Sequence, residues 1–231
     1  RQSSGHIYFS IKDDSTQLNC VLFRSTRVPQ KETIEDGQKV ILQGGLTVYE
    51  ARGQYQLIVK TVELQGVGAL QVEFERLKAS LNEEGLFDAA RKRKLPSISE
   101  RIGIVTSLSG AALRDILHVV QRRQPSLEIV LVDSRVQGEG AEAEIIKGIE
   151  WLNRWARSEP LDLILITRGG GAIEDLWTFN EESLARSIFS SVVPVVSAVG
   201  HEIDYTISDF VADFRAATPS AAAEIITSGG V

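Results

Sequence analysis

The stretch Leu161-Asp-Leu-Ile-Leu-Ile-Thr-Arg-Gly-Gly-Gly171 is a continuous apolar run that ends in Arg168 and three glycines. An apolar run beside glycine predicts a buried strand that leads into a turn of bare backbone. Continuous rather than alternating apolar residues are typical of parallel strands covered on both faces. The charged side chain therefore stands where a parallel strand ends, and in open α/β sheets ligands bind at that edge.

A second stretch of this kind runs from Val192 to Val199 and continues as Gly200-His201-Glu-Ile-Asp204. On a helical turn His201 and Asp204 share a face, so the carboxylate can orient the imidazole for acid–base work. A histidine that caps a helix is the structural alternative, and a metal site lacks the usual second histidine or cysteine. Arginine, histidine and aspartate beside glycine suit holding and cleaving an anion, and a phosphodiester fits them best.

Strand-like and helical segments alternate from Ile98 onward. This alternation predicts a three-layer α/β domain over residues 98–231 with a mainly parallel sheet. Thr218 and Ser220 are alternative N-caps for a last helix that has Pro219 in its first turn. The expected strands cover 101–106, 128–132, 161–167 and 192–199, and the expected helices cover 111–123, 141–157, 174–190 and 206–214.

The N-terminal residues 1–65 have the pattern of a small β-barrel. Gly44-Gly45 predicts a sharp bend or bulge, and residues 51–54 predict a hairpin tip, both of which a tightly curled barrel needs. This is the pattern of an oligonucleotide-binding (OB) fold, and we expect it to be incomplete at its N-terminal side. Short strands are expected at 6–12, 18–24, 39–44, 46–49 and 55–64.

Residues 66–97 read as a helical connector and a basic linker. Leu70, Phe74, Leu77 and Leu81 recur at helical spacing before Gly85 ends the run. The basic run 91–94 follows, and it has two open interpretations: a solvated linker, or a lip that contacts phosphates.

The composition narrows the class of protein. At 231 residues and 43% hydrophobic content the chain can build a hydrophobic core. Its net charge of −6 argues against a protein that binds along nucleic acid through overall electrostatic attraction alone. The single cysteine, Cys20, is expected in the core of a protein from the reducing cytoplasm. No apolar run is long enough to cross a bilayer and no leader is visible, so we expect no membrane association. The absence of methionine and the start at Arg1 predict a fragment of a longer protein.

Further candidate residues lie on the same predicted edge. The backbone amides of Gly169, Gly170 and Gly171 can approach a phosphate closely while Arg168 donates two parallel hydrogen bonds to it. The alternative interpretation is a tight turn with a surface arginine.

Ser107 and Ser109 follow the first strand of the α/β domain, where they either bond phosphate or cap the next helix, and capping is favoured. Asp115, in the first turns of the next helix, is either a functional acid or a purely structural one beside Arg114. His118, one turn further along, is expected to pack against the protein or to face solvent rather than to act in catalysis. The loop 137–140 completes a set of loops on one rim.

With these residues in view, the chain resembles the large subunits of bacterial exodeoxyribonuclease VII. Essentially the whole chain is covered, and motifs of this length are far more specific than a glycine pattern. In this family an OB domain precedes the catalytic domain and a long coiled-coil region follows it. The resemblance rests on residues 5–14, 48–57, 106–117, 136–140, 168–180, 194–204, 209–215 and 217–224.

The resemblance implies a nuclease that degrades single-stranded DNA from either end and releases short oligonucleotides. It implies no strictly required cofactor, with Mg²⁺ as an activator, and a small helical subunit that binds in several copies through a coiled-coil region absent from this chain. Carried over by motif position, the catalytic residues are Asp115, Arg168, His201 and Asp204.

In the mechanism that we expect, Arg168 and the glycine-loop amides stabilise the pentacoordinate phosphorane. His201 moves a proton and Asp204 sets its tautomer, while Asp115 is either a partner base or an anchor for Arg168. Two rivals stay open: a non-catalytic single-strand binder, and a nucleotide-binding or hydrolysing α/β enzyme. In the barrel, the candidates for stacking and backbone contact are Tyr8, Phe9, Tyr49, Tyr55 and Arg52.

Overall fold

The computed structural model describes residues 6–12, 16–26, 40–49, 53–64, 67–170, 173–200 and 205–228. The chain forms two compact units, Arg1–Glu73 and Phe74–Val231. The division falls inside helix α1 (Val67–Glu83), so the C-terminal part of the expected connector belongs to the second unit.

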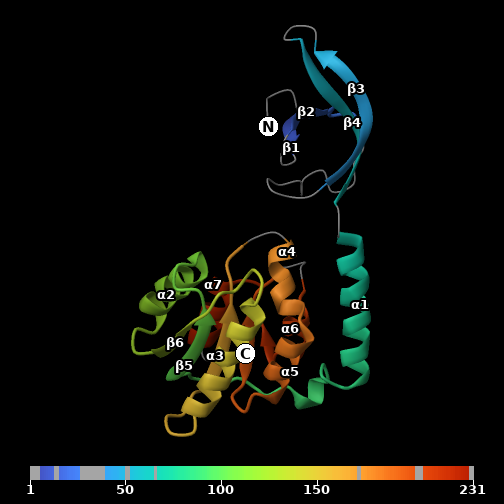
Figure 1. Cartoon of the computed structure of the whole chain (residues 1–231). Coiled ribbons are helices and arrows are strands. Elements are labelled where there is room, and N and C mark those ends of the chain that lie inside the picture. Colours follow the sequence, from blue (N-terminus) through green and yellow to red (C-terminus); the bar gives the residue numbers. More distant parts are fainter. Residues whose placement is uncertain are drawn as a thin grey trace. The chain divides into compact units, whose positions relative to one another are not determined.

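The first unit is a curved four-stranded sheet in the described residues (Figure 1). Strands β1 and β2 pair antiparallel, β2 and β4 pair parallel, and β3 and β4 pair antiparallel. Cys20, Leu22 and Val59 form its small core, so the cysteine is buried as expected. The strands are β1 (Ile7–Lys12), β2 (Gln17–Leu22), β3 (Val40–Tyr49) and β4 (Gln54–Leu64).

Strand β3 replaces two of the strands expected from the sequence. The expected strands 39–44 and 46–49 are one continuous strand whose register shifts between Gln43 and Gly44. The predicted bulge is therefore confirmed, but it bends a strand rather than ending it. A Cβ atom at Gly44 would lie 2.1 Å from the backbone oxygen of Ile58, so only glycine allows the two strands to approach here.

The second unit is built on a five-stranded sheet in the order β6-β5-β7-β8-β9, in which every neighbouring pair is parallel. None of the helices that the structure describes is both long and apolar enough to cross a membrane. The strands are β5 (Arg101–Thr106), β6 (Glu128–Asp133), β7 (Leu163–Thr167), β8 (Val195–Ala198) and β9 (Phe214–Arg215). The helices after α1 are η1 (Ala89–Arg91), α2 (Ala111–Arg123), α3 (Ala141–Trp155), α4 (Ile173–Leu176), η2 (Trp177–Asn180), α5 (Glu182–Ser190), α6 (Ile207–Val211) and α7 (Pro219–Thr227).

Helices cover both faces of this sheet, which confirms the three-layer expectation (Figure 1). Ile104 and Leu165 pack with α2 and α7 on one face, whereas Val105 and Ile166 pack with α3, α5 and α6 on the other. The alternation follows from the two-residue period of a strand. Because both faces are covered, the polar groups of this unit that bind ligands are expected at the strand ends.

The segment from Glu174 to Ser190, expected as one helix, is broken into α4, η2 and α5. The break turns Phe179 and Asn180 inward, where they are 1% and 8% exposed. The Phe179 carbonyl accepts from the hydroxyl of Ser208 instead of from a helical amide. A continuous helix would prevent these contacts, which are made to a segment distant in sequence.

The last part of the chain also departs from expectation in one place. Phe214 and Arg215 form β9 beside β8, although Phe214 was expected at the end of a helix over 206–214, which ends at Val211 instead. Two residues are too few to show strand periodicity in a sequence. The final helix begins as predicted, with the Thr218 hydroxyl accepting from the amide of Ala221 at the N-cap.

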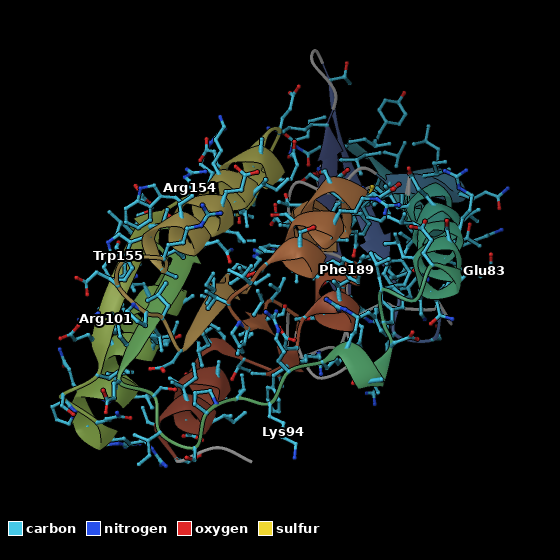
Figure 2. The ribbon with its side chains drawn as sticks, turned by 90° about the horizontal axis from the view of Figure 1, so that it is seen from below. Glu83, Lys94, Arg101, Arg154, Trp155 and Phe189 are labelled. Carbon is cyan, nitrogen blue, oxygen red and sulfur yellow. The ribbon has the colours of Figure 1, made fainter. Side chains whose placement is uncertain are left out.

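The basic run after η1 attaches the linker to the α/β unit. Arg91 donates to the carbonyls of Leu86, Val211 and Phe189, and Arg93 forms a two-pronged ion pair with Asp213. These contacts lie at the amino ends of the strands, where exposed Lys94 extends away from the ribbon (Figure 2). Arg91 and Arg93 are thus held by protein partners and are not free for phosphate, although both side chains stay partly exposed.

Candidate active site

The carboxyl ends of β5, β7 and β8 are joined by two buried threonines. Thr106 donates its hydroxyl hydrogen to the carbonyl of Thr167 at 2.9 Å, and Thr167 donates to the carbonyl of Ala198 at 2.8 Å. Helix α2 follows β5 on one face and α3 follows β6 on the other, so the strand order reverses between β5 and β7. This reversal is the place where α/β sheets bind ligands.

The loop after β7 lies against the first turn of α2. A Cβ atom at Gly169 would lie 3.8 Å from the amide nitrogen of Ala112 and 4.0 Å from the Cβ of Ala111. The glycine loop and the amino end of a 13-residue helix therefore share one site. Both offer backbone N–H groups, and the helix end adds partial positive charge.

Ser107 and Ser109 do not cap α2. The N-cap residue is Gly110, which makes no side-chain cap hydrogen bond, and the two hydroxyls bond to each other at 3.0 Å. The favoured expectation of helix capping was therefore wrong. The short turn closed by the Gly110 amide on the Ser107 carbonyl brings the chain into the helix without a capping side chain. The first-turn amides of α2 consequently keep their capacity for an anion.

Ser107 and Ser109 instead line a cavity of about 260 Å³ toward the end of β6. Its charged lining residues are Asp133, Arg135 and Glu144, and Arg135 is neutralised by an ion pair with Glu144 at 2.7 Å. Asp133 accepts a hydrogen bond from the amide of Leu108 at 3.1 Å but has no cationic partner among the described residues, so its negative charge makes this cavity a poor phosphate site. On the other side of the loop, Gly169 faces the first-turn amides of α2 and no carboxylate lies among its described neighbours within 4 Å.

Arg168 is the most unusual side chain of this edge because it is charged and only 2% exposed. Its Nη2 atom donates to the carbonyl of Gly170 at 3.0 Å and to Oε1 of Gln137 at 3.2 Å. Its Nε and Nη1 atoms are buried without a hydrogen-bond partner among the described residues.

Burial lowers the pKa of Arg168, and Asp175, 3.9 Å away, partly opposes that shift. An arginine stays protonated in proteins even so. A buried cation with unpartnered donors is costly, and an anion that supplied the missing acceptors would lower that cost.

Asp115 lies on the same face of α2 as Ala111, one turn further along, and is exposed. Its carboxylate makes no hydrogen bond or ion pair with any other residue that the structure describes. The described anchors of Arg168 are Gln137 and Gly170, so the expected anchoring role of Asp115 is not supported. Its carboxylate remains available on the side of α2 that faces the glycine loop.

His201 and Asp204 lie outside the described residues, as do Gly171 and Arg52. Both ends of the segment that carries His201 and Asp204 are described. On β8, Ser197 donates to Oδ1 of Asp209 at 2.6 Å, and after the segment Thr206 donates its amide and hydroxyl to Oδ2. Thr167 of β7 pairs with Ala198 of β8, so Val199 follows β8 at the same level at which Arg168 follows β7.

The sequence named Gln137 only as part of the rim loop 137–140 and gave no role to Asp209 or Asn180, although all three side chains bond segments at this end of the sheet. Asn180 accepts from the amide of Ile207 at 2.9 Å and so links the segment after the glycine loop to α6. A signal for Asp209 was present, because Thr206 and Asp209 form a capping box, a pattern that sequence can show. Gln137 and Asn180 act across strands and carry no local signal.

The OB unit has a cavity of about 610 Å³, and the described residues that line it carry no formal charge. Tyr8, Tyr49 and Tyr55 are 52%, 51% and 65% exposed there, whereas Phe9 packs against the core. Exposed aromatic rings beside amides can stack successive bases without reading sequence. The cavity is lined by Tyr8, Phe9, Ser10, Asn19, Cys20, Val21, Phe23, Tyr49, Gln54, Tyr55 and Gln56.

Comparison with known protein families decides the relationship. A family described as exonuclease VII, large subunit, matches residues 86–230, which contain the whole candidate active site. The chain belongs to the exonuclease VII large-subunit family. A second model, an OB-fold nucleic acid binding domain, matches residues 1–63 and confirms the fold expected for the first unit of this family member.

Curated relatives of this family carry the same name. The chain is 52% identical over 223 residues to the exodeoxyribonuclease 7 large subunits of Clostridium beijerinckii and Geotalea daltonii, covering 96% of this chain and 55% and 49% of those proteins. It is 50% identical over 225 residues to that of Serratia proteamaculans, covering 97% of this chain and 48% of the relative. The chain thus spans about half the length of these relatives.

Proposed function

We propose that this chain carries the DNA-binding and catalytic domains of an exodeoxyribonuclease that hydrolyses phosphodiester bonds of single-stranded DNA from either end and releases short oligonucleotides. The observation that carries the proposal is the buried guanidinium of Arg168, with two unpartnered nitrogens, beside the uncapped amino end of α2. The names of the family and of its relatives support the reaction class.

In this mechanism a water oxygen attacks phosphorus and the bond to the departing sugar oxygen breaks. Arg168 and the amides of the glycine loop and α2 stabilise the charge that develops on the pentacoordinate phosphorane. His201 transfers a proton, either from the water or to the leaving oxygen, and Asp204 sets its tautomer. Asp115, exposed on the same side, is the candidate partner base.

The proposal extends to partners. The word "large" in the names of the relatives supports a small-subunit partner, bound in several copies through a coiled-coil region outside this chain. Single strands reach the catalytic edge after stacking on the aromatic rings of the OB unit. Mg²⁺ enters only as an activator, because Arg168 and the helix end supply positive charge at the phosphate.

The test follows shortening of single- and double-stranded oligonucleotides labelled at either end, in chelator and in Mg²⁺. We expect the wild-type chain to shorten single strands from both ends in chelator. His201→Ala should lower the rate by about 10²- to 10⁴-fold, the range for loss of a general acid or base. His118→Ala is the matched control because His118 is exposed on α2. A wild-type chain that binds single strands but never shortens them would instead establish the non-catalytic binder.

The OB cavity gives a separate prediction about affinity. Tyr55→Ala should weaken binding of a labelled single strand by about 1–3 kcal/mol, because one stacked base loses its aromatic partner. Fluorescence anisotropy at fixed salt measures this, since affinity for nucleic acid changes with salt. Leu46→Ala is the control, because Leu46 is 62% exposed on β3 but does not line the cavity. Equal losses for both variants would argue against stacking on Tyr55.

A further inference from the structure

Gln137 reaches Arg168 from a distant part of the sheet. It lies in the loop between β6 and α3, and β5 separates β6 from β7 in the sheet. The loop must therefore pass over the end of β5 to bring the amide of Gln137 within 3.2 Å of Nη2 of Arg168. An arginine only donates hydrogen bonds, so the amide oxygen is the atom that faces it.

This loop is braced on both sides of Gln137. Before it, the amide of Ser134 donates to the carbonyl of Thr106 at the end of β5, at 3.1 Å. Arg135 donates its backbone amide and its Nε to the carboxylate of Glu144 on α3. After it, Gly138 has a φ of +87°, a conformation that favours glycine and turns the chain into α3. Such bracing keeps Gln137 in place without help from Arg168.

The hydrogen bonds of Arg168 show what Gln137 contributes. Nη2 has two hydrogens, and the carbonyl of Gly170 and the amide of Gln137 accept both. Nε and Nη1 keep three hydrogens without a partner among the described residues. Both hydrogen-bonded anchors are neutral, and the one carboxylate that pairs with Arg168 among the described residues, on Asp175, lies 3.9 Å from Nη2, beyond hydrogen-bond distance. The guanidinium is therefore held by neutral acceptors, with one long ion pair to Asp175 at Nη2 and none at Nε or Nη1 among the described residues.

We propose that Gln137 is a positioning residue that holds the Arg168 guanidinium through a neutral acceptor, so that Nε and Nη1 stay free for the scissile phosphate and the anchor adds no competing negative charge. This inference rests on the proposed function and adds a residue to which no role was assigned. The inference requires an amide at position 137. A carboxylate of the same shape would hold Arg168 more firmly, but its negative charge would compete with the phosphate for the positive charge of Arg168.

Two variants separate this role from a merely structural one. Gln137→Ala removes the acceptor, and we expect kcat on single-stranded DNA to fall about tenfold with KM changed by less than threefold, the cost of one hydrogen bond to a charged group. Gln137→Glu keeps an acceptor at the same place, and we expect it to lower kcat by about a further tenfold while the melting temperature stays at or above that of the wild type. A structural role predicts the opposite order, because activity would then follow stability.

The control for added charge is Gln121→Glu, on the exposed surface of α2, which should keep wild-type kcat. In an Arg168→Ala background neither Gln137 variant should change the affinity for single-stranded DNA any further, because Gln137 acts through Arg168. This double-mutant cycle and the order of melting temperatures need no cleavage. These two measurements therefore test the positioning role of Gln137 even if the wild-type chain does not cut DNA, a result that would refute the proposed function. Wild-type kcat in Gln137→Ala, or a Gln137→Glu protein more active than Gln137→Ala, would overturn the inference.

Discussion

Arg168→Ala is expected to lower the rate of single-strand cleavage by about 10²- to 10³-fold, the usual cost of removing one preorganised donor to a developing oxyanion. The melting temperature should not fall with it. The guanidinium is buried with two unpartnered nitrogens, so its removal relieves a desolvation cost that offsets the lost packing. Cleavage of labelled oligonucleotides together with thermal unfolding measures both effects on one preparation.

Two further variants sharpen this experiment. Arg168→Lys keeps the positive charge but not the planar array of donors, so its rate should lie between those of the wild type and Arg168→Ala. Arg122→Ala removes an exposed arginine from α2 and should leave the rate unchanged. If cleavage by Arg168→Ala declined only in step with unfolding, the residue would be structural and the phosphorane assignment would be lost.

The α/β fold could be predicted in detail because its signals are local. The continuous apolar runs gave the four longer strands of the sheet, and α2 has the bounds expected from its periodicity, Ala111–Arg123. The errors occurred where a distant partner decides the local structure. Asn180 breaks a predicted helix in order to bond the amide of Ile207, and Phe214 becomes a strand only because Val196 lies beside it.

The candidate site shows the same division. Arg168 and its glycine loop were recognisable because a charged residue followed a buried strand directly. The neutral anchor of Arg168 was not, because Gln137 reaches it only through the strand order β6-β5-β7, which no local pattern encodes. Ser107 and Ser109 were misjudged as caps for a similar reason. Serine before a helix favours capping, but here the turn at Gly110 makes the hydroxyls bond each other.

Arg93→Ala is expected to destabilise the α/β unit by about 3 kcal/mol at neutral pH, the lower end of the cost of leaving a buried charge without its partner. Arg93 donates its amide, Nε and Nη2 to the carboxylate of Asp213, whose side chain is 2% exposed. Asp213 also accepts from the amide of Val195 at the start of β8. The pair thus fastens the linker to the edge of the sheet. Lys94→Ala, next to it but exposed, should change stability by less than about 0.5 kcal/mol.

The pH dependence of this loss tests its electrostatic origin. Burial raises the pKa of Asp213, but the hydrogen bonds and charge of Arg93 outweigh burial and leave that pKa lowered. A lowered folded-state pKa means that the pair stabilises the protein above the unfolded value of about 3.9, and that this stability is lost as pH falls through the folded value. The gap between wild type and Arg93→Ala in denaturant unfolding should therefore be widest near pH 7 and narrow toward pH 3. A gap independent of pH would show that Arg93 stabilises by packing alone, because protonation of Asp213 would then leave its contribution unchanged.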